Sequence, residues 1–181
     1  ALFIVEDAFK RKLISKGGTI VEGTAANTGI GLAVVCKEYD LKLKIVIPKT
    51  QSIEKKVALK KLGAELIEVD AVPYSNPKNY IKQSKKIAED LNKKSKNGVY
   101  WANQFDNLIN TEAHIQTTSE EIWSQTAGSV DGFTCAVGTG GTLAGVSIGL
   151  KSKNKNIKIA LSDPMGSVSY THLTLPTSDL V

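Results

Sequence analysis

Two glycine-rich loops are the segments of this sequence best suited to chemistry. The first reads GTAANTG from Gly23 to Gly29, and the second reads GTGGT from Gly138 to Thr142. Each follows a β-branched strand pattern and leads into a helical pattern. A loop in that place directs the first unpaired N–H groups of the helix, and the positive end of the helix dipole, toward an anion that binds there. Both loops therefore predict anion-binding sites.

The side chains of the two loops add to this prediction. In the first loop, Asn27 and Thr28 supply further donors. In the second, the glycines permit positive φ and close approach of a ligand to the backbone, and Thr139 and Thr142 offer hydroxyls to a dianionic group. The second loop lacks Gly-x-x-x-x-Gly-Lys and fits the dinucleotide spacing poorly. A single such turn is often only a tight connection, but two favour a cofactor cleft, with a phosphate as the expected ligand.

Strand-like runs alternate with helical patterns, which predicts an α/β fold with parallel sheets covered by helices. The expected strands are Thr19–Val21, Lys44–Ile47, Glu65–Val69, Val99–Ala102, Phe133–Val137 and Ile157–Leu161. The expected helices between them are Gly29–Tyr39, Ser52–Leu62 and Pro77–Leu91. Because residues 128–132 are glycine-rich, we expect a smaller, mobile subdomain over residues 1–128 and the start of a larger, cofactor-binding domain over 129–167.

Composition favours an ordinary globular protein and argues against several classes of function. The chain has 181 residues, of which 41% are hydrophobic and 23% charged, and a formal net charge of +5. It contains no apolar run long enough to span a bilayer and no signal-peptide pattern, so we expect a cytoplasmic location and no membrane partner. Arg11 is the single arginine among many lysines, which predicts solvated helix faces rather than a nucleic-acid surface.

Few side chains are available for a metal site or a catalytic triad. Cys36 and Cys135 fall in a helical and a strand pattern, and we expect buried thiols rather than a disulfide or a zinc site. His114 is the one histidine before residue 168. A Ser-His-Asp triad therefore has little support, and we expect a structural or surface role for His114.

Residues 168–181 fit neither the strand-like nor the helical pattern of the rest of the sequence. The run VSYTHLTLPT at 168–177 is what a transposase mosaic-end sequencing adapter encodes in one frame. We expect this segment, including His172, to be an adapter artefact, and the gene to be cut near Ser167.

Four motifs, in this order, resemble the pyridoxal-phosphate-dependent cysteine synthase and cystathionine β-synthase family, the fold-type II enzymes. They are GTAANTGIGLA at Gly23–Ala33, PKTQSIEKKVALKKLGAELIEV at Pro48–Val69, NQFDNLIN at Asn103–Asn110 and VGTGGTLAGV at Val137–Val146. The resemblance spans nearly everything from residue 1 to 167, and the cysteine synthase (O-acetylserine sulfhydrylase) branch is the most similar. It implies pyridoxal 5′-phosphate as cofactor and a fold-type II architecture, incomplete at both ends.

The resemblance also implies roles for single residues. The loop Thr24–Gly29 matches the family loop that binds the α-carboxylate of the amino-acid substrate, and Gln104 matches a glutamine that grips the same carboxylate. Asn27 would also bind the phenolic oxygen of the cofactor. The implied substrate-binding set is Thr24, Ala25, Asn27, Thr28 and Gln104, and the implied phosphate cup is Gly138, Thr139, Gly140, Gly141 and Thr142.

Two loop positions depart from the family pattern. Ala25 stands where a serine is usual, which removes a hydroxyl donor. Ala26 stands where a glycine is usual, and alanine disfavours positive φ. We expect carboxylate binding to be weaker or differently shaped than in the family.

The activity implied for the complete protein is β-replacement, in which O-acetylserine and sulfide give cysteine and acetate. The resemblance also implies a homodimer, which is the usual oligomeric state in this family. The alternatives are cystathionine β-synthase or a β-eliminating dehydratase on the same scaffold and, from another class, a non-catalytic binding domain. A Rossmann-type nucleotide domain would need an acidic residue closing the second strand, where Pro48 and Lys49 stand.

The family's Schiff-base lysine lies in a Ser-x-Lys-x-Arg segment directly before the helix that begins here at Ala1. We therefore expect no catalytic lysine within this chain, and an internal fragment that is inactive by itself. Sequencing of the reading frame upstream of Ala1 should reveal Ser-x-Lys-x-Arg immediately before it. An upstream frame without that motif would contradict the enzyme assignment.

Overall fold

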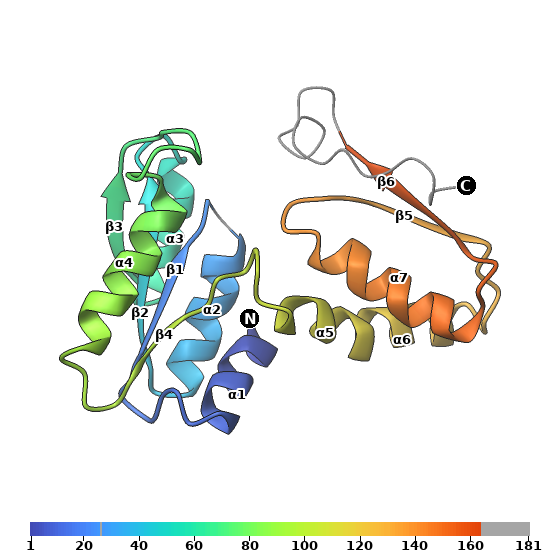
Figure 1. Cartoon of the computed structure of the whole chain (residues 1–181), viewed down its shortest axis with the longest axis horizontal. Helices are drawn as coiled ribbons and strands as arrows, with labels where there is room; N and C mark the ends of the chain where they lie inside the picture. Colours follow the sequence, from blue (N-terminus) through green and yellow to red (C-terminus); the bar gives the residue numbers. More distant parts are fainter. Residues whose placement is uncertain (26, 164–181) are drawn as a thin grey trace. The chain divides into compact units, whose positions relative to one another are not determined.

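The computed structural model describes residues 1–25 and 27–163. The chain divides into two compact units, one over Ala1–Ile109 and one beginning at Asn110 (Figure 1). Its elements are α1 (Leu2–Lys10), β1 (Thr19–Gly23), α2 (Asn27–Glu38), β2 (Lys42–Pro48), α3 (Ile53–Lys61), β3 (Glu65–Val69), α4 (Tyr80–Asn92), β4 (Val99–Trp101), α5 (Ile109–Gln116), α6 (Thr118–Gln125), β5 (Gly132–Ala136), α7 (Gly141–Lys153) and β6 (Lys158–Ser162). The adapter artefact expected at 168–181 and the departure expected at Ala26 lie outside the described residues.

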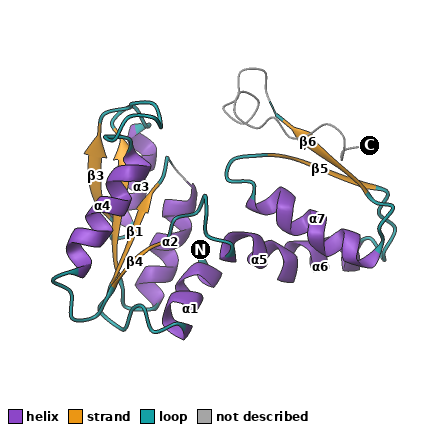
Figure 2. Ribbon diagram, in the orientation of Figure 1, coloured by secondary structure: helices purple, strands orange, loops and turns teal. Residues whose placement is uncertain are grey.

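The first unit is built on a parallel sheet with the strand order β3-β2-β1-β4. Thr19 of β1 lies opposite Lys42 of β2 on one side and Val99 of β4 on the other. Right-handed crossovers to β2 and β3 run one way and the crossover to β4 runs back, so α4 lies on the opposite face from α2 and α3 (Figure 2). All five residues of β1 are buried, as in a central strand covered on both faces. The predicted covered parallel sheet is confirmed in this unit.

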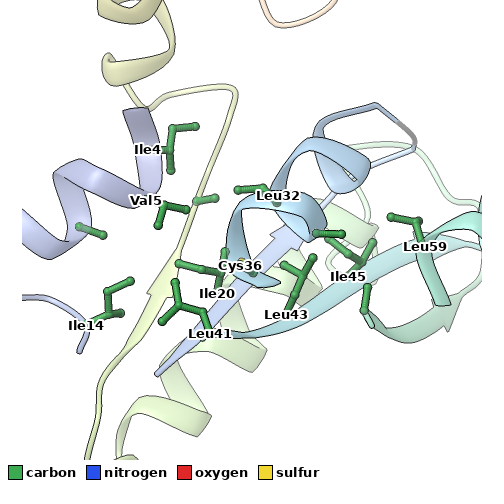
Figure 3. Packing of buried hydrophobic residues seen from close by; sticks show 14 of the residues in the cluster. Ile4, Val5, Ile14, Ile20, Leu32, Cys36, Leu41, Leu43, Ile45 and Leu59 are labelled. Atoms are coloured by element: carbon green, nitrogen blue, oxygen red, sulfur yellow. The ribbon is translucent and has the colours of Figure 1, made fainter. Parts of the chain in front are cut away.

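The core of the first unit lies between the sheet and the helices α1 and α2. Leu32 and Cys36 of α2 pack with Ile20 of β1 and Ile45 of β2, and Val5 of α1 joins the same cluster (Figure 3). Burial raises the pKa of the Cys36 thiol to about 12. This thiol is buried and unpaired, as expected, and at neutral pH it stays protonated and unreactive.

Local polar signals set the ends of several elements. The Ser52 hydroxyl accepts a hydrogen bond from the N–H of Lys55 at the start of α3, and the Asn79 side chain accepts one from Ile81 at the start of α4. Such caps satisfy N–H groups that have no partner within the helix. β2 ends at Pro48, which has no N–H to continue a ladder.

The second unit carries a two-stranded parallel sheet, β5–β6, joined by α7. Along β5 exposed and half-buried residues alternate. Phe133 and Cys135 are the half-buried ones, so only one strand face is covered among the described residues. The expectation of a buried thiol at Cys135 is therefore wrong, because a two-stranded sheet leaves its side chains partly open.

Three glycines one turn apart let α7 lie very close to α5 and α6. A Cβ built on Gly145 would lie 2.5 Å from the carbonyl oxygen of Thr111, and one on Gly149 would lie 2.0 Å from the Oγ of Ser119. Gly141 is equally crowded, 2.5 Å from Asn110. This packing accounts for the division of the chain after Ile109, and the predicted subdomain boundary at residue 128 stays a prediction for the complete protein. The helices α5 and α6 belong with α7.

The glycine contact can be tested with Gly149→Ala. In an exposed helix, alanine is more stable than glycine by about 1 kcal/mol. At residue 149 the added methyl group would overlap Ser119, so we expect the free energy of unfolding to fall by about 1–3 kcal/mol. Urea unfolding measures the change, with exposed Lys151→Ala as a control that should shift it by less than about 0.5 kcal/mol. Stabilisation by Gly149→Ala would contradict the close packing.

Candidate functional site

The first glycine-rich loop connects the carboxyl end of β1 to the N-terminus of α2, as predicted. Thr24 is 3% exposed, and its N–H donates to the carbonyl of Val46 at 3.1 Å. A Cβ on Gly29 would lie 3.0 Å from the Cγ2 of Thr24, so the first turn of α2 packs directly on the loop. The loop is thus anchored to β2, and the first N–H groups of α2 belong to the segment that begins at Asn27.

The structure brings Thr28 and Gln104 together, although 76 positions separate them in the sequence. The Thr28 hydroxyl donates to the Oε1 of Gln104, and the Nε2 of Gln104 donates to the carbonyl of Gly23 at 3.4 Å. Gln104 is 8% exposed. It follows β4, the strand paired with β1, so both residues sit at the carboxyl ends of neighbouring parallel strands.

The other members of the predicted substrate-binding set lie on the same loop. Asn27 is exposed at the start of α2, where its side chain is open to a ligand. Ala25 is half-buried in a bend, and its φ is not positive. Asn103, just before Gln104, does have a positive φ of 45°, which makes the sharp turn that directs Gln104 toward β1.

Glu22 is a residue of this site that the sequence reasoning missed. It is 1% exposed, and its Oε2 has no hydrogen-bond partner among the described residues. Burial raises the pKa of Glu22 to about 8, although hydrogen bonds from the backbone of Gln104 and Asn103 and from the Gln104 side chain act against the shift. A glutamate between Val21 and Gly23, in an otherwise apolar strand, was the available signal.

The raised pKa makes stability depend on pH in a direction that can be checked. Between about 4.5 and 8, the folded state holds a proton on Glu22 that the unfolded state has lost, so Glu22 lowers the free energy of unfolding as pH rises. The slope from this group is about 1.4 kcal/mol per pH unit. Glu22→Gln should remove it, so that the difference between variant and wild type grows with pH in urea unfolding. The exposed control Glu89→Gln should keep the wild-type slope, and an unchanged slope in Glu22→Gln would contradict the assignment.

The second glycine-rich loop connects β5 to α7, also as predicted. Gly140 precedes the helix with a φ of 85°, a left-handed conformation that favours glycine. A Cβ on Gly138 or Gly140 would meet no heavy atom within 4 Å. The space above this backbone is therefore open to a ligand, at the N-terminus of a 13-residue helix.

Side chains of α5 hold both threonines of this loop. The Nδ2 of Asn110 donates to the Oγ1 of Thr139 at 2.8 Å. His114 lies between two hydroxyls, with its Nε2 3.1 Å from the Oγ1 of Thr142 and its Nδ1 2.9 Å from the Oγ1 of Thr118. Burial lowers the pKa of His114, so its ring is neutral at neutral pH. The structural role expected for His114 thus includes a contact with the loop that the sequence reasoning did not foresee.

The described residues contain no group of three or more His, Cys, Asp or Glu side chains that could hold a metal ion. Within that same part of the chain, no helix is long and apolar enough to cross a membrane.

Comparison with known proteins is consistent across sequence and structure. The model of a family described as pyridoxal-phosphate dependent enzyme matches residues 1–177. Cysteine synthase 1 of Emericella nidulans is 51% identical over 174 residues, which are 96% of this chain and 46% of that protein. Cysteine synthase 1 of Neurospora crassa is 51% identical over 96% of this chain and 45% of its own length. The chain thus spans about half the length of these relatives.

Solved structures of the same kind are similar throughout the chain. A hydrogen sulfide-producing enzyme from Fusobacterium nucleatum matches with a TM-score of 0.82 and 38% sequence identity. The match covers 94% of this chain and 55% of the chain of that enzyme. An O-ureido-L-serine synthase matches with a TM-score of 0.81 and 31% sequence identity. This match covers 94% of the present chain and 52% of the chain of the synthase.

Proposed function

Because this chain belongs to the family of pyridoxal-phosphate dependent enzymes, we propose that it is part of a cysteine synthase that converts O-acetylserine and sulfide to cysteine and acetate. The observation that carries the proposal is the contact between Thr28 and Gln104 at the N-terminus of α2. It places two side chains that can donate hydrogen bonds beside the first N–H groups of a helix, where a substrate carboxylate would replace the Oε1 of Gln104 as the acceptor of the Thr28 hydroxyl.

The residues of the second loop fit the phosphate group of pyridoxal 5′-phosphate. Open backbone at Gly138 and Gly140 allows close approach, and the N-terminus of α7 supplies N–H groups and a positive dipole end. Thr139 and Thr142 add two hydroxyls at the same place. A dianionic phosphate prefers such a set of donors.

When bound, pyridoxal phosphate acts as an electron sink that makes the α-proton of an amino acid acidic and its β-substituent a leaving group. The task of the first unit is to hold the substrate's carboxylate with Thr24, Asn27, Thr28 and Gln104. In the overall reaction the bond from Cβ to the acetate oxygen breaks and a bond from Cβ to sulfur forms. The proton removed from Cα returns to it in the product. We propose that the lysine that carries the cofactor precedes Ala1.

Several relatives named cysteine synthase, from fungi, Dictyostelium discoideum and Staphylococcus aureus, support β-replacement with sulfide over the cystathionine-forming and eliminating alternatives. The family resemblance further supports a homodimer as the working form of the complete enzyme, and we propose a cytoplasmic location for it.

The carboxylate assignment can be tested in the full-length protein with Gln104→Ala and Thr28→Val. Loss of one hydrogen bond to a charged group should raise the KM for O-acetylserine about tenfold or more, with the pyridoxal phosphate content unchanged. The exposed Gln116→Ala serves as a matched control and should leave the KM unchanged. Unchanged KM values in both Gln104→Ala and Thr28→Val would contradict the assignment, and a wild-type protein that forms no cysteine would contradict the function.

A further inference from the structure

Asn110 and His114 lie four residues apart on α5, so their side chains project from the same face of this helix. The glycines of α7 bring that face close to the second loop. A Cβ on Gly141 would lie 2.5 Å from the Nδ2 of Asn110, and one on Gly145 would lie 2.6 Å from the Cβ of His114. Two polar side chains of α5 can therefore reach the two threonines of the loop.

The oxygen of Thr139 is held as an acceptor. The side-chain NH₂ of Asn110 can only donate, and it does so at 2.8 Å. The backbone N–H of Gly141 points at the same oxygen from 3.4 Å. A hydroxyl has two lone pairs and one proton. With both lone pairs directed to these donors, the proton of Thr139 remains available to a ligand above the loop.

The oxygen of Thr142 can be held in the same way only by one of the two neutral forms of His114. If the Nε2 carries the proton, it donates to the Oγ1 of Thr142, and the threonine proton is free to donate to a ligand. If the Nδ1 carries the proton, the Nε2 must accept the proton of Thr142, and only lone pairs face the ligand. A phosphate dianion accepts hydrogen bonds and repels lone pairs, so it favours the first form.

We propose that Asn110 and His114 are positioning residues that hold the oxygens of Thr139 and Thr142 as acceptors, so that both hydroxyls donate to the cofactor phosphate, with His114 protonated at Nε2. This inference rests on the phosphate cup of the proposed function. It adds a direction to the hydrogen-bond chain: the Thr118 hydroxyl donates to Nδ1, Nε2–H donates to Thr142, and Thr142 donates to the phosphate.

The burial of His114 supports this chain, because burial lowers the pKa of the ring and keeps it neutral. A neutral ring must donate at one nitrogen and accept at the other. Thr118, the first residue of α6, is placed to donate to Nδ1 through its hydroxyl.

The protonated nitrogen can be read directly from ¹⁵N shifts of histidine-labelled, full-length holoenzyme. Protonated and unprotonated ring nitrogens have well-separated shifts, and the signals that vanish in His114→Gln belong to His114. Protonation at Nε2 in the holoenzyme is the expected result. Protonation at Nδ1 would overturn the proposal, and this measurement needs no turnover.

A double-mutant cycle separates positioning from a general structural role. His114→Phe and Thr142→Val should each raise the Kd for pyridoxal 5′-phosphate about tenfold, and the double variant should be no worse than Thr142→Val alone, because His114 acts through that hydroxyl. Asn110→Leu and Thr139→Val should behave in the same way, with Gln116→Ala as the control on the same helix. His114→Gln, whose amide can still donate, should regain part of the affinity.

The outcomes of the cycle are distinct. Additive increases in Kd, or variants with wild-type affinity, would overturn the positioning role while leaving the enzyme assignment intact. A wild-type protein that binds no pyridoxal phosphate would overturn both the proposed function and the inference that rests on it.

Discussion

Parallel pairing of β1 with β4 is the interaction on which the surroundings of the first glycine-rich loop depend. Because the two strands run in the same direction, their carboxyl ends meet at one edge of the sheet. The loop that follows β1 and the turn that follows β4 are therefore neighbours, and Thr28 reaches Gln104 across them. At the same edge the side chain of Glu22 is buried beside the backbone of Asn103 and Gln104, where an ionised carboxylate is unfavourable. A site that concentrates donors thus includes an acid that is neutral when protonated and costly when ionised.

In the second unit, helix packing takes the place of strand pairing as the organising constraint. The strand-to-helix connection alone would supply backbone N–H groups and an open space above Gly138 and Gly140. Side chains of α5 also determine whether the hydroxyls of Thr139 and Thr142 donate or accept hydrogen bonds, which the backbone of the loop alone does not determine. Asn110 and His114 each hold one threonine oxygen, and both side chains come from a helix that precedes the loop by more than twenty residues.

Local patterns predicted the elements well, since the strands, the two loops and the main helices depend on spacing that can be read over ten to fifteen residues. β2 closing at Pro48 is such a feature. The contact of Gln104 with Thr28 was accessible only through resemblance to a family. Glu22 was missed, and His114 was expected to have only a structural or surface role, because the surroundings of both residues come from segments remote in sequence. The division after Ile109 was not foreseen for the same reason, because the packing that joins α5 and α6 to α7 depends on three glycines spaced by four residues.

The glycine-lined face of α7 couples the packing of this unit to the position of the second loop. Any side chain larger than hydrogen at residue 141, 145 or 149 would move the helix away from α5 and α6. Because the N-terminus of the same helix forms the second loop, such a shift would also carry Thr142 away from His114. Substitutions on this face therefore cannot change the packing of the unit without also changing the geometry of the proposed phosphate cup. A substitution that alters one property is therefore expected to alter the other.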